Sequence, residues 1–232
     1  MSAAGAPSRW SSSADGAYRD PATPPTAVAS PAGPFDAETD PVQGDEPIAD
    51  PLSLASSWLA GQGEDRMLMT LATTDPDGFP RVRTVILSEF DGERFFFHTD
   101  ARSAKVADLA RDERVGLSVV WPAFSRQLVV QGTAEPAPAE ELADAYAKRS
   151  PYLRQLAWQN TAEFARLPLA ERLAQWGAWG AQHPEPAQPP DWAGFGVRPH
   201  RMLFWVSNPD AASRRIEYTR APAGWEHRHL PG

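Results

Sequence analysis

Apolar and polar residues alternate in short runs along most of the chain, a pattern that predicts many short β-strands. Turn sequences separate the first runs, at Asp75-Pro76-Asp77-Gly78 and at Asp91-Gly92. Such turns favour antiparallel neighbours. The predicted strands are 67–74, 80–90, 94–99, 114–121, 127–135, 195–206, 213–220 and 224–229.

Four segments have the apolar spacing of helices. The first begins at Asp50-Pro51, where Asp50 is a typical N-cap and Pro51 a typical first helical residue, and it ends before Gly61. In the last, Leu169, Leu173 and two tryptophans form an apolar stripe. The other three predicted helices are 103–111, 137–149 and 169–182, and a Pro-rich loop follows at 184–190.

Many short strands with interposed helices predict an α+β fold, a mainly antiparallel β-barrel with peripheral helices. The expected domain comprises residues 50–232. Residues 1–49 are rich in Ala, Pro and Ser and lack apolar periodicity, so we expect a disordered tail, with a short piece docked near Phe35. A solvated leader without function is the alternative for this tail.

Composition narrows the function classes. The chain has no cysteine, which excludes disulfides, thiolate metal sites and cysteine nucleophiles, so redox chemistry would need a bound cofactor. A net charge of -8 argues against a nucleic-acid or anionic-membrane surface and favours a small-molecule partner. No stretch has the apolar length of a membrane span, and residues 1–10 lack the features of a signal peptide, so we expect a cytoplasmic protein.

Candidate anion-binding residues occur at two places. Arg83 lies in the apolar strand 80–90, where its planar guanidinium could bind a phosphate. Thr99, Ser103 and Lys105 bring two hydroxyls and a second cation to a strand end and helix start. Together these residues suit one phosphoryl group, although each cation alone is equally compatible with a solvated surface charge.

Other motifs carry little chemistry. His227 and His229 could share a strand face, but no third ligand is near in sequence, so no metal site is expected. The chain has no P-loop, no GxSxG and no GxGxxG. Gly194-Phe195-Gly196 is interpreted as the entry of a strand, because no strand-helix context follows it.

The order of these pieces resembles the pyridoxamine 5'-phosphate oxidase family over about residues 50–230. The matching pieces are a helix that starts Asp-Pro, then LATTDPDGFPRVRTVIL, FFFHTDARSAK, VVWPAFSRQLVVQGTAE, PPDWAGFGVRP, MLFWVS and RRIEYTRAPAGWEHRHL. The specificity of the resemblance lies in their order and spacing. It implies an FMN-binding split β-barrel that works as a homodimer, with FMN at the interface.

The resemblance also implies the cofactor contacts. Arg83 and Lys105 would hold the FMN phosphate, and Gln127 would hydrogen-bond the flavin. Arg215 would stabilise the negative charge of the reduced ring. An ordinary cross-strand ion pair with Glu217 or Asp210 is the alternative for this arginine. Trp205 would contact the flavin, and its alternative is a core or interface aromatic. The full set of expected cofactor residues is Arg83, Thr84, Val85, Ile86, His98, Thr99, Ser103, Lys105, Gln127, Trp205 and Arg215.

The chain departs from the family at the substrate side. Ser88 stands where the vitamin B6 enzymes have a lysine that grips the substrate phosphate, and Ala211 and Ser213 stand at an RxH pair. Arg149 matches the family clamp, and a second phosphate arginine is Ala104 here. Tyr146 is displaced by one position, and Leu153 replaces a serine. The expected substrate contacts are Ser88, Arg149 and Ser213.

A retained cofactor half with a rebuilt substrate half resembles the flavin oxidases of phenazine biosynthesis, whose ending is similar to GWEHRHL. We expect an FMN-dependent oxidase that aromatises a small cyclic metabolite, with oxygen as acceptor and no assigned acid or base. Tyr152, Trp158 and Phe164 could stack on a flat substrate or pack in the core. The alternatives are pyridoxamine or pyridoxine 5'-phosphate oxidation and a non-catalytic flavin-binding protein.

Overall fold

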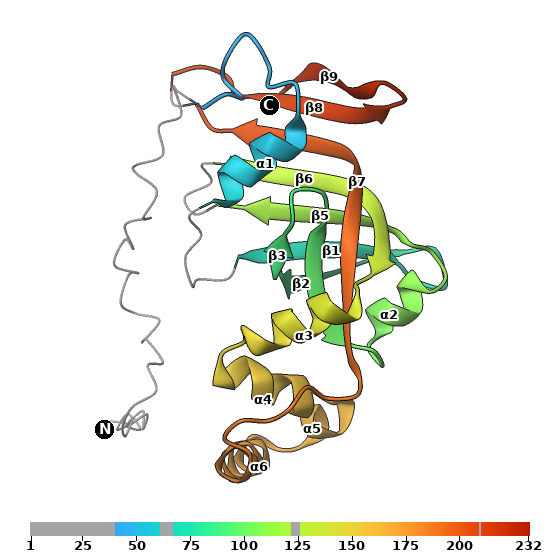
Figure 1. Ribbon diagram of the computed structural model, residues 1–232, viewed down its shortest axis with the longest axis vertical. Coiled ribbons are helices and arrows are strands. Elements are labelled where there is room, and N and C mark those ends of the chain that lie inside the picture. The colour runs from blue at the N-terminus through green and yellow to red at the C-terminus, as the bar shows by residue number, and fades with distance from the viewer. Residues whose placement is uncertain (1–39, 61–66, 122–125, 209) are drawn as a thin grey trace, which may run out of the picture.

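The computed structural model describes residues 40–60, 67–121, 126–208 and 210–232. Its strands form one sheet in the order β2-β1-β5-β6-β7-β4-β3, and β8 pairs with β7 and β9 (Figure 1). Every strand pair is antiparallel. The strands are β1 (Leu68–Thr74), β2 (Pro80–Ile86), β3 (Glu89–Phe90), β4 (Phe95–Asp100), β5 (Arg114–Val120), β6 (Arg126–Pro136), β7 (Trp192–Val206), β8 (Arg214–Ala221) and β9 (Gly224–Pro231).

Six helices accompany the sheet within the described residues. Figure 1 shows α1 across the front of the sheet and α3 to α6 gathered at one end of it. The short α2 follows β4 and contacts β1. The helices are α1 (Pro51–Leu59), α2 (Ala104–Leu109), α3 (Ala139–Ala147), α4 (Pro151–Gln159), α5 (Ala162–Arg166) and α6 (Leu169–Gln182).

The long strand β7 connects the two ends of the molecule (Figure 1). It pairs with β6 over nearly its whole length, with β4 along its first half and with β8 along its second half. A strand of this length spans roughly 45 Å when extended, at about 3.3 Å per residue. The register of β7 therefore fixes where residues of β4, β6 and β8 lie relative to one another.

The core occupies the concave side of the sheet. Leu71, Leu128, Phe204 and Ile216 are almost completely buried there. Trp58 of α1 covers one end, since its ring meets Trp121 and Phe204 edge-on at centroid distances of 5.4 and 5.1 Å. Alternate residues of the same strands consequently point away from the core, to the outer face of the sheet.

The folded part begins earlier than the predicted boundary at residue 50. Val42 is fully buried, and the Arg214 guanidinium donates to the carbonyl oxygens of Val42 and Gln43, at 3.3 and 2.6 Å. Tyr218 Oη donates to the Ile48 carbonyl at 2.8 Å. This segment is held by two buried side chains, Asp40 and Val42, and by hydrogen bonds to backbone carbonyls, which leave no apolar periodicity in the sequence. The remainder of the expected tail, including Phe35, lies outside the described residues.

The antiparallel strands and the helices that flank them agree with the predicted fold class. Gly78 and Gly92 adopt φ values of 87° and 93°, a conformation that suits glycine and explains both predicted turns. Two differences stand out: the expected strand 80–90 is divided into β2 and β3, and α4 and α5 occupy a region for which no helix was predicted. Both helices are short and start at polar caps, Ser150 and Thr161.

None of the described helices is long and apolar enough to span a membrane.

Packing of residues 40–49 should contribute measurably to stability. Val42→Ala removes buried methyl groups and leaves a cavity, so the free energy of unfolding should fall by about 1–2 kcal/mol. Urea denaturation of the full chain measures the change. The exposed Glu46→Gln is the matched control and should unfold like the unsubstituted chain; equal stability of Val42→Ala and this control would contradict the packing.

Candidate cofactor site

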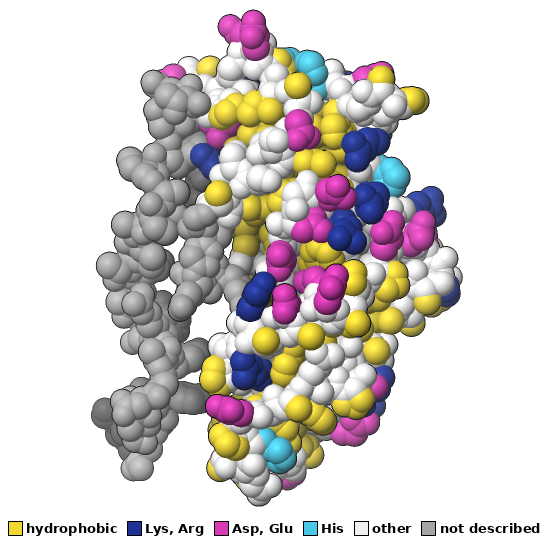
Figure 2. Space-filling view, viewed as in Figure 1, with side chains coloured by type: hydrophobic (Ala, Val, Ile, Leu, Met, Phe, Trp, Pro, Cys, Tyr) yellow, Lys and Arg dark blue, Asp and Glu magenta, His cyan; other side chains and the backbone are white. Residues whose placement is uncertain are grey.

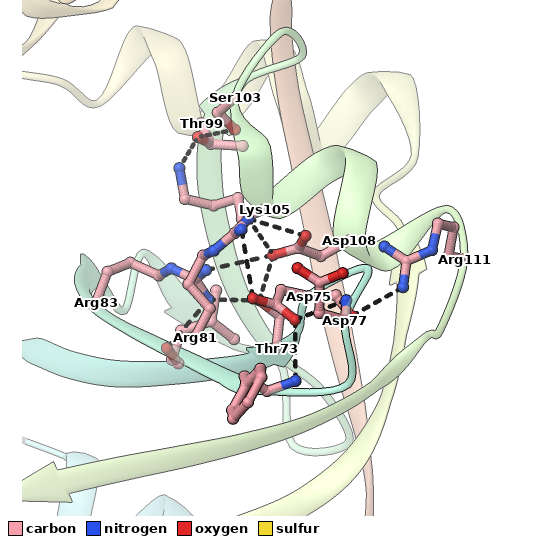
Figure 3. Close-up of polar contacts among 12 residues, drawn as sticks. Thr73, Asp75, Asp77, Arg81, Arg83, Thr99, Ser103, Lys105, Asp108 and Arg111 are labelled. Atoms are coloured by element: carbon pink, nitrogen blue, oxygen red, sulfur yellow. Dashed lines mark hydrogen bonds and ion pairs between the residues drawn. The ribbon is translucent and has the colours of Figure 1, made fainter.

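Two cations from different elements converge beside the end of β4 (Figure 3). Lys105 of α2 donates from Nζ to Thr99 Oγ1 at 2.8 Å, and Thr99 Oγ1 lies 3.3 Å from Ser103 Oγ. Arg83 of β2 lies near enough to Lys105 to lower the pKa of that ammonium by charge repulsion. The structure thus brings together the four residues predicted to hold a phosphate.

A buried carboxylate holds the arginines of β2 in place. Asp108 of α2 is 1% exposed and lies 3.0 Å from Arg81 Nη1 and 3.5 Å from Arg83 Nη2. Its Oδ2 also accepts a hydrogen bond from Thr73 Oγ1 at 2.8 Å, and Arg83 Nη1 donates to that same hydroxyl at 2.7 Å. Asp108 therefore fixes the Arg83 side chain before any ligand binds.

The cluster suits an anion. Burial is the main cause that lowers the pKa of Lys105, and Arg83 lowers it further, with only partial compensation from Asp100. A bound phosphate would supply the negative charge that a half-buried ammonium beside a guanidinium lacks. The donor set of two cations and two hydroxyls fits the oxygens of one phosphoryl group.

The expected flavin contacts form a straight row across three strands. Gln127 of β6 is opposite Trp205 of β7, and Trp205 is opposite Arg215 of β8. Gln127 Nε2 donates to Ser118 Oγ at 3.1 Å, and Trp205 Nε1 donates to Ser213 Oγ at 2.9 Å. We refer to Gln127, Trp205 and Arg215 as the outer row, because their sequence neighbours Leu128, Phe204 and Ile216 are the ones that face the core.

Arg215 has an unused donor. Its Nε is buried and has no hydrogen-bond partner among the described residues. The cross-strand ion pair considered as its alternative does not form with Glu217, whose carboxylate is bound by Arg228 at 2.6 and 2.8 Å. A buried donor without an acceptor costs about 1–3 kcal/mol, so a ligand oxygen at this place would be favourable.

The phosphate cluster and the outer row face opposite sides of the sheet. Arg83 is paired with Leu71, a core residue, and so points to the inner side, whereas the outer row points away from it. They are also far apart along the sheet, since Thr99 is opposite Ala193, and Ala193 and Trp205 are separated along β7 by roughly 40 Å in extended conformation. One ligand cannot contact both groups within one chain.

His98 lies on the other face of β4 from Thr99, under α3. Its Nδ1 is 2.8 Å from Ser88 Oγ, and its Nε2 is 2.7 Å from Glu141 Oε2. Burial, together with repulsion from Glu89, raises the pKa of the Glu141 carboxyl to about 7. Ser88, one of the three expected substrate contacts, is therefore hydrogen-bonded to His98, an expected cofactor contact.

Arg149, the second expected substrate contact, is linked to the same place by stacking. Its guanidinium lies 4.3 Å from the centre of the Trp192 ring, and Trp192 stacks on His98 with centroids 5.1 Å apart and planes 8° apart. Ser213, the third, lies instead on the outer side with Trp205. The structure thus separates Ser213 from Ser88 and Arg149.

The expected strand residues Thr84, Val85 and Ile86 alternate in direction. Val85 packs against the core, whereas Thr84 is exposed and opposite Thr70 on the outer face. Ile86 is opposite Leu68 on that same face. Because neighbouring side chains point to opposite faces, a single ligand that lies along this strand could contact all three residues only through their backbone atoms.

The aromatic residues proposed to stack on a flat substrate pack against α6. Tyr152 and Phe164 approach Trp176 at centroid distances of 5.4 and 6.3 Å, and Trp158 approaches Trp179 at 6.2 Å. A cavity of about 320 Å³ is lined by Trp158 and Phe164 with Gln159, Thr161, Glu163, Leu167 and Gln175. These aromatic residues contact α6, but Tyr152 and Trp158 are 60% and 37% exposed, so they do not lie in the core, and their stacking on a substrate stays a prediction.

Three side chains of the site were missed by sequence reasoning. Asp108, Glu141 and Trp192 act through contacts with Arg83, His98 and Arg149, each from a distant element. Nothing in local pattern marks them, since Asp108 and Glu141 lie on helices with other acidic residues nearby. Asp108 could have been anticipated only as an acidic residue on the side of α2 that is turned toward the arginines of β2.

Figure 2 shows acidic and basic side chains interspersed over the middle of one face of the molecule. Such alternation gives no extended field of one sign on that face. Among the described residues, no three His, Asp or Glu side chains are placed to hold a metal ion.

Comparison with known proteins places the chain among its relatives. The family model described as pyridoxamine 5'-phosphate oxidase matches residues 62–206. The pyridoxine/pyridoxamine 5'-phosphate oxidase of Caulobacter vibrioides is 35% identical over 189 residues, covering 78% of this chain and 84% of that protein. The enzyme of the same name from Bacteroides fragilis is 32% identical over 200 residues, covering 81% and 83%.

Solved structures share the fold. PhzG from Burkholderia lata, in complex with tetrahydrophenazine-1-carboxylic acid, has a TM-score of 0.69 at 24% identity and covers 81% of this chain and 95% of its own. An FMN-binding protein from Nostoc punctiforme related to pyridoxamine 5'-phosphate oxidase has a TM-score of 0.58 at 16% identity, covering 78% and 94%. The predicted α+β split barrel is confirmed. The chain belongs to the pyridoxamine 5'-phosphate oxidase family.

Proposed function

We propose that this protein is an FMN-dependent oxidase of a small cyclic substrate that carries no phosphate group. Membership of an oxidase family supports both the oxidoreductase activity and FMN as the cofactor. The observation that carries the substrate class is Ser88, whose hydroxyl bonds His98 where a phosphate-gripping lysine was expected from the resemblance. A hydroxyl held by an imidazole supplies no positive charge to a phosphate.

The cofactor would be held from two sides. Arg83 and Lys105, with Thr99 and Ser103, would bind its phosphate, while Asp108 keeps Arg83 oriented. The outer row would contact the ring, with the unused Nε of Arg215 directed to a ring oxygen. When bound, FMN would supply hydride acceptance from the substrate and electron transfer to dioxygen. A fixed cation at the ring edge favours negative charge there without reorganisation.

The opposite orientation of these two groups supports a homodimer. A second copy would supply the outer row to the phosphate cluster of the first. The outer face has exposed apolar residues that support this arrangement: Leu68, Val82 and Val120 are 62%, 59% and 45% exposed. All three are on the same face as Gln127.

The substrate would lie between Ser88 and the stacked pair Arg149–Trp192. The Arg149 guanidinium offers a flat cationic surface that suits a planar ring, and the buried Trp192 ring, stacked on His98, positions it. PhzG is similar in fold and was solved with a reduced tricyclic acid, which supports a related compound as the test substrate.

Oxidation of pyridoxine or pyridoxamine 5'-phosphate is the second candidate. The names of relatives at 35% and 32% identity favour it. Arg149, which matches the family clamp in the resemblance, also favours it. The lack of a lysine at position 88 is the observation that disfavours it.

The phosphate cluster is tested with the chain's two lysines. Lys105→Met removes a charge-assisted hydrogen bond worth about 1.5–3 kcal/mol, so the dissociation constant for FMN should rise by about 10- to 100-fold. Lys148→Met removes the same charge from an exposed position and should leave FMN affinity unchanged. Quenching of FMN fluorescence measures both, and an equal effect of the two substitutions would rule out the assigned phosphate site.

The dimer is tested on its apolar outer face. Leu68→Glu should convert a dimer to a monomer in analytical ultracentrifugation at micromolar concentration, because it buries a carboxylate at the interface. Leu173→Glu on α6 changes an equally exposed leucine and should leave the dimer intact. A monomeric unsubstituted chain that binds FMN tightly would refute the arrangement.

The substrate class is tested by reduction of bound FMN under anaerobic conditions. Tetrahydrophenazine-1-carboxylic acid should bleach the flavin absorption faster than pyridoxamine 5'-phosphate, and Ser88→Lys should lower the concentration of the phosphate compound that gives half-maximal bleaching rate by about tenfold or more. Faster bleaching by pyridoxamine 5'-phosphate in the unsubstituted protein would favour the second candidate.

A further inference from the structure

Ser88, His98 and Glu141 form a continuous hydrogen-bonded chain. The two contacts of the imidazole, 2.8 Å to Ser88 Oγ and 2.7 Å to Glu141 Oε2, use both ring nitrogens. A neutral imidazole carries one proton and can exchange it between these two sides. A hydroxyl, an imidazole and a carboxyl in this order can pass a proton from one end of the hydrogen-bonded chain to the other.

Burial restricts how this chain meets solvent. The His98 side chain is 1% exposed, so water reaches it poorly, while the Glu141 side chain is 15% exposed and Ser88 is partly exposed. The proton can therefore enter at the hydroxyl and leave at the carboxyl, with a sheltered imidazole between them.

The surroundings fix the imidazole. Trp192 stacks on one face of the ring, and a Cβ at Gly194 would lie 2.6 Å from His98 Cδ2, so only glycine lets β7 pass at this place. The imidazole is thereby held in an orientation that keeps both of its hydrogen bonds, which favours proton transfer between its two partners.

The carboxyl end is prepared to take up a proton near neutral pH. Glu141 Oε1 is buried and has no hydrogen-bond partner among the described residues, which disfavours the ionised form. Burial raises the pKa of Glu141 to about 7; Glu89 of β3 and Asp144 of α3 also raise it, and Lys148 and Arg94 lower it. The other charged group beside the ring stack is Arg149.

We propose that Ser88, His98 and Glu141 are a proton relay that accepts the proton lost by the substrate during its oxidation. This inference rests on the proposed function, which supplies the oxidised flavin as acceptor of the hydride. The substrate gives its proton to Ser88 Oγ, the Ser88 hydroxyl proton passes to His98 Nδ1, and the Nε2 proton passes to the Glu141 carboxylate. The substrate thus loses one hydride and one proton, and the relay ends with a neutral Glu141.

The first test needs neither flavin nor substrate. In the full chain labelled with ¹⁵N-histidine, the His98 resonances, assigned by their loss in His98→Gln, should exchange between the two tautomers over about pH 6 to 8 as Glu141 ionises. Glu141→Gln should abolish this transition, because an amide cannot ionise. Glu140→Gln, at the adjacent exposed position of α3, should leave it unchanged. His98 resonances that stay constant with pH, or that titrate equally in Glu141→Gln, would overturn the relay.

The second test uses the FMN-loaded protein and whichever of the two candidate compounds bleaches it. Glu141→Gln and Ser88→Ala should each slow bleaching by about tenfold or more, at unchanged FMN affinity, since acid-base catalysis typically contributes about 10²–10⁴. The rate of the unsubstituted protein should inflect near pH 7, and Glu141→Gln should lose that inflection. Rates and pH profiles equal to those of Glu140→Gln would overturn the relay. Failure to bind FMN, or bleaching by neither compound, would count against the proposed function, and the histidine titration would still decide the relay.

Discussion

Antiparallel pairing along β7 fixes the relative positions of the strands that carry the candidate site residues. It aligns Gln127, Trp205 and Arg215 in one row, and it places Thr99 opposite Ala193 at the distant end of the same strand. Because successive residues of a strand point to opposite faces, the row lies outside the barrel while Leu128, Phe204 and Ile216 fill the core. A cofactor site built from both groups therefore requires two copies of the chain.

Charge balance within the phosphate cluster follows from a few buried contacts. Asp108 neutralises part of the charge of Arg81 and Arg83, and it holds Thr73 in the same network. Lys105 is hydrogen-bonded to the Thr99 hydroxyl and lies beside a second cation, Arg83, so the positive charge of the cluster suits an anion. At the opposite face of β4, His98 has a different environment of Ser88, Glu141 and Trp192. The two faces of β4 thus carry the proposed phosphate site and the proposed proton relay.

The sequence alone predicted the strands, the Asp-Gly turns and the residues of the phosphate cluster, because these follow from period-two patterns, turn chemistry and family resemblance. It did not predict the burial of Val42, which depends on carbonyl contacts with Arg214. The partners Asp108 and Glu141 were also missed, since each faces its target across a tertiary contact. Ser213 lies beside Trp205, apart from Ser88 and Arg149 within one chain, and its role as a substrate contact stays a prediction.

In the proposed dimer, one copy holds the FMN phosphate and the other holds the ring. Mixing two FMN-deficient variants, Lys105→Met and Arg215→Met, under conditions that let subunits exchange tests this arrangement. A hybrid dimer should contain one site with both substitutions and one intact site, so mixing should restore tight FMN binding in proportion to the hybrid formed. If the mixture binds FMN no better than either variant alone, both groups of residues belong to the same copy and the account is wrong.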